Sequence, residues 1–173
     1  MAFKFLIVSF LSAVLLSSCV TGPTGPTCTH VLPNHLNKAN DKIILSSDAT
    51  PVQLFKFNRC RAGFEDEEAQ YRLALNYEEG VGTEQNYKWA VKWYKEAGRH
   101  KSGLQWRHGS EIATKVGPEN PGHPIAQYRL GMMYLEGRGR DQSDDFARLW
   151  IGRAAEQGYR SAVTEYKMLK EVE

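Results

Sequence analysis

The sequence predicts an all-α protein: a short α-solenoid of helical hairpins with an N-terminal capping segment and a C-terminal capping helix. The main observation is an internal duplication, because residues 69–98 and 126–155 share 13 identities in 30 positions at a fixed offset of 57. Apolar residues in both copies recur at the period of a helix, and a Gly-x-Gly sequence follows the first helix of each copy. Duplicated units of this kind stack into solenoids, which typically bind other molecules rather than catalyse reactions.

The chain is expected to begin with an export signal. Lys4 provides a positive start, residues 5–16 are mostly apolar, and two serines precede Cys19. This apolar run is too short for a transmembrane helix. The sequence LSSC resembles the lipobox of bacterial lipoproteins, which implies that residues 1–18 are a lipoprotein signal peptide and that Cys19 is lipidated. The alternative is an ordinary signal peptide with a coincidental cysteine.

A bacterial envelope location follows from this interpretation. In a Gram-negative host, Val20 stands where an aspartate would resemble an inner-membrane retention signal, so outer-membrane anchoring facing the periplasm is expected. Residues 19–27 are predicted to be a flexible tether, because they hold too many turn-forming residues for helix or strand. Removal of the signal leaves 21 basic and 20 acidic residues. This balance gives no polybasic face, so no nucleic-acid partner is expected.

Residues 28–66 are predicted to form the N-terminal capping segment. Cys28 and Cys60 are the two cysteines left in an exported chain, where oxidation is permitted, so one disulfide between them is predicted. A reactive thiol beside His30 is the competing view. Thr50 and Pro51 suit the N-cap and first position of a helix that ends near Gly63, after an irregular leader.

Each copy is predicted to be a helical hairpin, the first over residues 67–100 and the second over 123–158. In the first copy Ala69, Leu73 and Tyr77 form one helical stripe, and the second copy repeats it. Asn86 and Ser143 stand where the N-caps of the second helices belong.

The two copies resemble a known repeat. The pattern A-x-x-x-L-[AG]-x-x-Y-x-x-G-x-G, followed by A-x-x-W and a further alanine, is similar to the Sel1-like repeat (SLR), a relative of the tetratricopeptide repeat. In the second copy 36 residues separate Ala126 from Ala162, the spacing of this family. The first copy departs mildly, with Ala74 in place of Gly131. The resemblance implies an adaptor that binds proteins.

Residues 101–122 interrupt the 36-residue period as an insertion. Its residues 102–116 are predicted to extend or add a helix, after which the proline-rich sequence GPENPGHP ends it. Such an insertion either contributes to the binding surface or covers an apolar seam between the hairpins. Residues 159–173 are predicted to form the C-terminal capping helix, with Ala162, Tyr166 and Leu169 inward.

The residues provide no pattern for catalysis or for a cofactor. The five histidines show no zinc spacing, the Gly-x-Gly loops lack the strand and the lysine of a phosphate cradle, and no nucleophile stands in a recognisable elbow. Neither a metal, nor a cofactor, nor a small-molecule substrate is therefore expected, and the chain is not expected to be an enzyme.

Candidate partner-binding residues are of the types found at interface hot spots. They are Tyr71, Arg72, Asn76, Trp106, Tyr128, Arg129 and Met133. Alternatively, Tyr71 and Tyr128 simply pack against the neighbouring hairpin.

Three functions are compatible with this sequence. The first is a scaffold or adaptor for envelope complexes. The second follows from a resemblance of small periplasmic SLR lipoproteins to immunity proteins, which bind and occlude type VI secretion phospholipase effectors. The third, a cell-wall or β-lactam hydrolase, is disfavoured because the repeats lack the cysteine pairs of that group.

Overall fold

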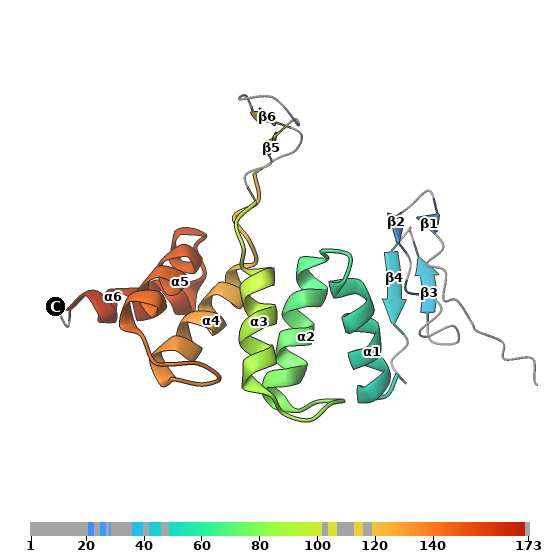
Figure 1. Ribbon diagram of the computed structural model, residues 1–173, viewed down its shortest axis with the longest axis horizontal. Helices are drawn as coiled ribbons and strands as arrows, with labels where there is room; N and C mark the ends of the chain where they lie inside the picture. The colour runs from blue at the N-terminus through green and yellow to red at the C-terminus, as the bar shows by residue number, and fades with distance from the viewer. Residues whose placement is uncertain are drawn as a thin grey trace, which may run out of the picture.

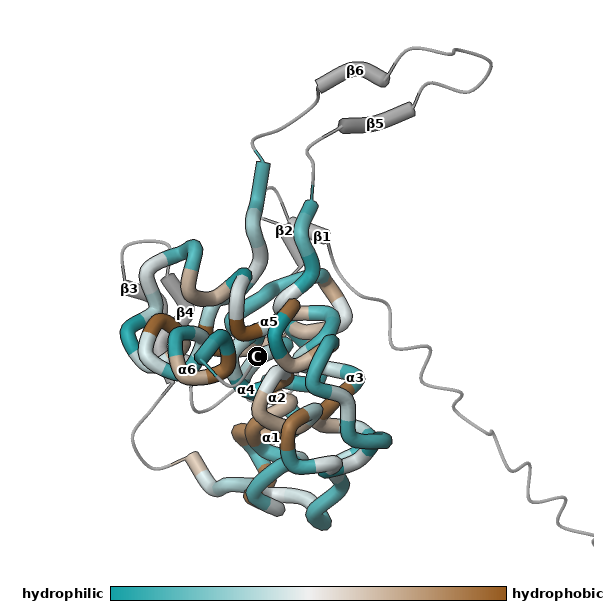
Figure 2. The backbone as a smooth tube through the Cα atoms, turned by 90° about the vertical axis from the view of Figure 1, so that its left-hand side faces the viewer, coloured by the Kyte–Doolittle hydropathy of each residue, from teal (hydrophilic) through white to brown (hydrophobic). Residues whose placement is uncertain are grey.

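The computed structural model describes residues 49–101 and 119–171, together with Cys28 and the backbone of six short strands. Six helices lie side by side in chain order and form one elongated array (Figure 1). They are α1 (Pro51–Ala62), α2 (Glu67–Glu79), α3 (Tyr87–Ala97), α4 (Pro124–Glu136), α5 (Asp144–Glu156) and α6 (Arg160–Glu171). Seen along the array in Figure 2, the helices overlap in projection, as in a stack. The predicted all-α solenoid of hairpins is confirmed.

Local signals set the ends of the helices as the sequence predicts. The side chains of Thr50, Asn86 and Ser143 accept hydrogen bonds from backbone N–H groups at the starts of α1, α3 and α5. Helices α2 and α4 end at Gly80 and Gly137, which adopt left-handed φ angles of 71° and 67°. Each Gly-x-Gly loop therefore turns the chain back into the second helix of its hairpin.

The core of the array consists of many alanines together with larger aliphatic and aromatic residues. Ala90, Ala126, Leu130, Ala147 and Ala154 have no exposed surface. The small side chains let the helices approach closely, and Gly131 shows how closely, since a Cβ atom there would lie 2.4 Å from Cγ1 of Ile151. One buried cluster contains residues of both hairpins, whereas Ala69 and Leu73 of α2 belong to a second cluster with α1, and Tyr77 and Trp93 pack against both clusters.

Helix α1 occupies the place of a second helix in a preceding repeat. A Cβ atom on Gly82 would meet the Pro51 carbonyl oxygen at 2.2 Å, and one on Gly139 would meet the Tyr87 carbonyl oxygen at 2.5 Å. Pro51 and Tyr87 are 36 residues apart, which is one repeat period. The N-terminal cap thus continues the repeat geometry with a divergent sequence.

Helix α6 corresponds to the first helix of a third repeat, and it is the last helix of the described residues. Its Ala162 is fully buried, as is Ala126 one period earlier. Lys167 and Lys170 are equivalent to Gly131 and Tyr134, the positions at which α5 packs against α4. Both lysines are exposed. Packing of another helix on this face would bury these charges, which is unfavourable, and the role of α6 as a terminal cap stays a prediction.

The insertion differs from the expectation, because a strand pair replaces the predicted helix. Strands β5 (Leu104–Trp106) and β6 (Ala113–Lys115) pair antiparallel, and Lys101 and Asn120 exchange backbone hydrogen bonds of 2.8 Å below them. A 15-residue helix would separate its ends by about 22 Å. The end of α3 and the start of α4 are neighbours, so a ribbon that returns to its origin fits this junction.

Strands also occur where the N-terminal region was expected to be irregular. Strand β1 (Thr21–Gly22) pairs with β2 (Gly25–Pro26), and β3 (Leu36–Ala39) pairs with β4 (Lys42–Leu45), both antiparallel. The prediction of no strand within residues 19–27 was wrong, since turn formers also fold short segments back alongside each other. The predicted disulfide joins buried Cys28 to Cys60 of α1, across a separation of 32 residues.

The predicted signal peptide over residues 1–18 and the lipidation site Cys19 lie outside the described residues. Within the part of the chain that the structure describes, none of the helices has the length and apolar character needed to cross a bilayer.

Candidate protein-binding face

The predicted tyrosines lie on the first helices of the two repeats, at equivalent positions, and both are half-buried. The Tyr71 ring stacks on His123 with a centroid distance of 4.5 Å and lies 6.2 Å from the ring of Tyr94. The Tyr128 ring packs 5.3 Å from the ring of Tyr159, which precedes α6. Each tyrosine therefore packs against the next unit of the array, as the alternative interpretation states, while part of its ring remains exposed.

Arg129 interacts electrostatically with both tyrosines and is held by a buried carboxylate. Its Nη1 atom is 3.4 Å from Oε2 of Glu78, a residue of α2 that retains 5% of its exposure. Arg138 approaches the same carboxylate at 3.1 Å, and the Tyr94 hydroxyl donates to it at 2.5 Å. One carboxylate thus receives donors from both repeats, and this network fixes the guanidinium of Arg129 next to the exposed surface.

The protonation of this group of side chains is set by burial and by the Glu78 charge. Burial alone would lower the pKa of Arg129, but the carboxylate of Glu78 and neighbouring groups raise it further above its usual value. Burial raises the pKa of Tyr71 and of Tyr128. At neutral pH this region therefore presents a permanent cation flanked by hydroxyl groups that can donate or accept hydrogen bonds.

We call Tyr71, Tyr128, Arg129 and Tyr159 the tyrosine–arginine face. Tyr71 and Arg129 come from different repeats but interact electrostatically, and Tyr128 interacts with Arg129 and Tyr159. The structure therefore brings three of the predicted residues together. Arg72, the equivalent of Arg129, is exposed and pairs with Glu68 at 2.6 Å on its own helix.

Three further candidates do not join this face. Met133 has no exposed surface, so its prediction as a binding residue was wrong. Asn76 is the equivalent residue of the first repeat, and its Oδ1 accepts a hydrogen bond of 3.0 Å from Asn58 of α1. This repeat position therefore faces the helix that precedes the repeat. Asn76 also donates to the Val81 carbonyl at 3.0 Å, so its amide is used internally. Trp106 is on β5, and its side chain lies outside the described part of the structure.

Sequence reasoning missed Glu78, His123 and Tyr159. Glu78 had a detectable signal, because the second repeat has apolar Leu135 at the same position. His123 caps α4 through a hydrogen bond of 3.3 Å from the Ala126 N–H to Nδ1. A histidine N-cap is not among the preferred residue types, so its capping role was not evident beforehand.

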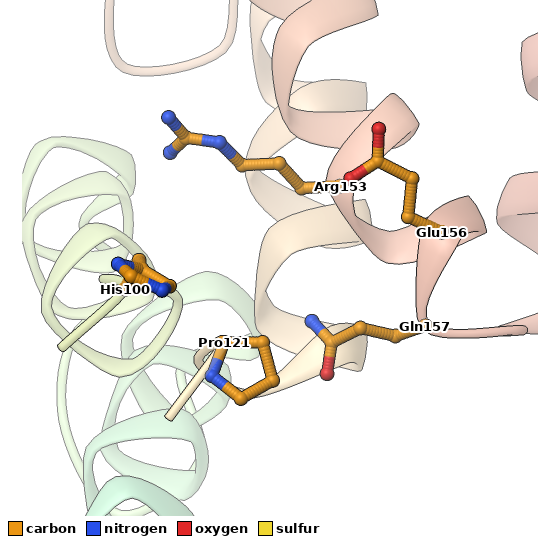
Figure 3. A pocket seen from close by; sticks show the side chains of 5 residues that line it. All are labelled: His100, Pro121, Arg153, Glu156 and Gln157. Atoms are coloured by element: carbon orange, nitrogen blue, oxygen red, sulfur yellow. The ribbon is translucent and has the colours of Figure 1, made fainter. Parts of the chain in front are cut away.

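An open pocket of about 410 Å³ lies where the two repeats and the base of the insertion meet (Figure 3). The side chains of Arg153 and Gln157 reach from the α5 end toward His100 and Pro121, whereas the Glu156 carboxylate points elsewhere. Its lining combines one guanidinium with an exposed imidazole and gives no nucleophile with an adjacent base. Among the described residues, no group of three acidic, histidine or cysteine side chains is placed to hold a metal ion.

Comparison with known proteins identifies the repeats. Residues 67–102 and 124–159 match the family described as Sel1 repeat. The fold is similar to that of a Sel1 repeat protein from Oxalobacter formigenes, with 25% identity and a TM-score of 0.56 over 72% of this chain and 42% of that chain. A search of curated proteins finds no match to this chain.

A second solved structure shows the same relationship. A protective antigen present in uropathogenic Escherichia coli strains, which displays an SLR fold, is 30% identical with a TM-score of 0.51 over 69% of this chain. The alignment covers 21% of that antigen, so this chain spans less than half of either relative. The repeat match and the hairpin geometry together show that the protein is a Sel1-like repeat protein with the SLR fold.

Proposed function

We propose that this protein is a binding module for another protein and that the tyrosine–arginine face is its docking surface. Sel1 repeats generally mediate protein–protein interaction, and stacked repeats provide extended surfaces for it. The observation that supports this face is that Arg129, held by buried Glu78, interacts electrostatically with both half-buried Tyr71 and Tyr128. Tyrosine and arginine are enriched among the residues that dominate binding energy, especially when their surroundings hold them in place.

Preorganisation is the physical reason to favour this face over other exposed residues. Glu78 and Tyr94 fix the guanidinium of Arg129 before any partner arrives, and Tyr159 supports the ring of Tyr128. Side chains that are already ordered lose little rotamer entropy on binding, which leaves more of the contact energy for affinity. Exposed Arg72 lacks this support from a buried carboxylate.

The test is capture of the partner by the full chain and by variants in the proposed docking surface. Tyr128→Ser and Tyr159→Ser remove exposed aromatic area without touching Glu78. Each is expected to weaken partner binding at least tenfold, the loss of about 1.4 kcal/mol that defines a significant contact. Val52→Ser is the control, since Val52 is also an exposed apolar residue but lies on α1. Equal binding by all four proteins would place the docking surface elsewhere.

The partner is proposed to be a component of a bacterial envelope complex. This rests on the lipobox resemblance of residues 16–19, which implies anchoring through Cys19. Cys19→Ala is expected to release the protein from membranes, and mass spectrometry of the intact N-terminal peptide detects the lipid. Recovery of a secreted phospholipase instead of a resident complex would favour the immunity function.

A further inference from the structure

The two repeats expose an aromatic ring at the same repeat position. Trp89 retains 43% of its exposure and Phe146 retains 49%, and they are 57 residues apart. Each ring stacks on the equivalent tyrosine of its hairpin, Trp89 on Tyr77 at 6.0 Å and Phe146 on Tyr134 at 5.1 Å. Large rings that are both exposed and held by stacking are suited to contacts with another macromolecule.

These rings lie along one edge of the array. The backbone N–H groups of Trp89 and Phe146 donate to the N-caps of α3 and α5, so both rings are in the first turn of a second helix. Figure 1 shows α1, α3 and α5 starting at the lower edge, opposite the end of α3 from which the insertion leaves. The α4–α5 loop bridges the two starts, because the Arg138 guanidinium lies 5.6 Å above the ring of Tyr87.

The residues before the two rings carry opposite charges. Lys88 precedes Trp89 and Asp145 precedes Phe146, and both charged side chains are exposed. Neither has an ion-pair partner among the described residues. Asp145 suits the positive end of α5, but a lysine in the first turn of α3 is unfavourable for the helix dipole. Helix stability therefore explains Asp145 and leaves Lys88 unexplained.

We propose that this edge, formed by Lys88, Trp89, Asp145 and Phe146, binds a second copy of the chain across a twofold axis. An axis between the two repeats places Lys88–Trp89 of one copy opposite Asp145–Phe146 of the other. In an interface of this symmetry each contact occurs twice, so one self-complementary pair of charges gives two ion pairs. The opposite charges at equivalent positions are what this arrangement requires, and they favour a second copy over an unrelated partner.

The proposed dimer leaves the tyrosine–arginine face uncovered. The two surfaces have no residue in common, since the edge belongs to the starts of α3 and α5 and the face belongs to α2, α4 and Tyr159. Two copies would then present two docking surfaces, which raises the apparent affinity for a partner with repeated sites. The dimer itself does not depend on the proposed function.

Sedimentation velocity of the full chain over a micromolar concentration series tests the dimer. The wild type is expected to associate reversibly. Lys88→Glu and Asp145→Lys each place like charges opposite each other at two symmetric points, so each variant is expected to raise the dissociation constant at least tenfold. The double variant restores opposite charges and is expected to recover most of the affinity.

Lys167→Glu is the matched control, because it reverses a charge that is also exposed but lies on α6. It is expected to dimerise as the wild type does. Circular dichroism establishes that every variant is folded, which matters for Asp145→Lys at the start of α5. A monomeric wild type throughout the series would overturn the proposal, and so would a dimer that is unchanged by both single reversals.

Discussion

The hydroxyl of Tyr94 donates a hydrogen bond of 2.5 Å to the carboxylate of Glu78, and this contact ties α3 to α2 inside the first repeat. Arg129 and Arg138 of the second repeat approach the same carboxylate at 3.4 and 3.1 Å. Burial of Tyr94, together with the hydrogen bond to Glu78, raises the pKa of its hydroxyl far above the usual range. The Tyr94 proton therefore stays in place while the carboxylate holds two cations, and the repeats are joined through one charged group.

Replacement of Glu78 is expected to destabilise the array more than any surface substitution. In Glu78→Gln the two guanidinium groups lose their counter-charge, so we expect a loss of roughly 2–3 kcal/mol in the free energy of unfolding. This is below the 3–5 kcal/mol of a fully buried pair, because the arginine side chains keep 38% and 33% exposure. Urea unfolding measures the change. Glu79→Gln, one residue further along and exposed, is expected to be near neutral.

The two equivalent glutamines of the AQYRL sequence are expected to differ in their contribution to stability. Gln127 donates to the Gly98 and Pro121 carbonyls at 2.9 and 2.6 Å and accepts from Gln157 at 2.7 Å. Gln70 donates to the Ala62 carbonyl at 3.2 Å, and its buried Oε1 has no hydrogen-bond partner.

Gln127→Leu should therefore cost about 2–3 kcal/mol, because it leaves several polar groups unsatisfied, whereas Gln70→Leu should cost less than about 1 kcal/mol. Thermal unfolding of both variants measures the difference. Equal destabilisation would contradict this account of the two hydrogen-bond sets.

A glycine can be required by a left-handed φ angle or by lack of space for a Cβ atom, and Gly139 and Gly158 allow the two effects to be compared. Both adopt left-handed φ angles, 75° and 79°, but an added Cβ atom meets the Tyr87 backbone at Gly139 and nothing within 4 Å at Gly158. Gly158→Ala should cost about 1–2 kcal/mol from backbone strain alone. Gly139→Ala should cost clearly more, because the loop must also move away from α3. Chemical denaturation of the two variants gives both values.

The contact between His123 and Glu68 predicts a pH effect. Burial alone would raise the pKa of Glu68, but hydrogen bonds with His123 and Arg72 and their charges bring it below its usual value. A carboxylate with a lowered pKa stabilises the fold above its unfolded-state value, and this contribution is lost as the pH falls through the folded-state pKa.

His123→Asn keeps an N-cap for α4 but removes the ring that lies 3.1 Å from Glu68. The pKa of Glu68, followed by carbon-detected NMR, is expected to rise in this variant. Arg72→Gln should also raise it, since Arg72 pairs with the same carboxylate at 2.6 Å. An unchanged pKa in both variants would show that burial and solvation dominate this carboxylate.

The sequence was sufficient to predict the hairpins because duplication, periodicity and caps all indicate the same boundaries. Thr50, Asn86 and Ser143 were placed correctly at helix starts, and Gly80 and Gly137 at helix ends. The insertion was less predictable, because its short apolar runs are compatible with both helix and strand. The insertion must leave and return between the neighbouring ends of α3 and α4. This constraint, and not the secondary-structure preference of its residues, determined its structure.

The residue types of the candidate face could be predicted from the sequence, but which residues lie together on it could not. Tyr71, Tyr128 and Arg129 were found from composition, whereas Met133 was misplaced because a methionine is equally suited to a core and an interface. Glu78 became significant only when α2 and α4 were adjacent, since its partners Arg129 and Arg138 are 51 and 60 residues away. Contacts of that range depend on how the hairpins stack.

The closed base of the insertion has a consequence for engineering. Lys101 and Asn120 pair through their backbones, Asn120 donates to Glu67 at 2.7 Å, and Lys101 contacts Glu65 at 3.2 Å. Gln70 and Gln127 donate to carbonyls at the end of the preceding helix, across 8 and 29 residues. The difference of 21 is the amount by which the offset of 57 exceeds the repeat period of 36, so the insertion leaves this stacking contact unchanged. Foreign peptides exchanged for the segment above this base would be displayed without altering the periodicity of the surrounding scaffold.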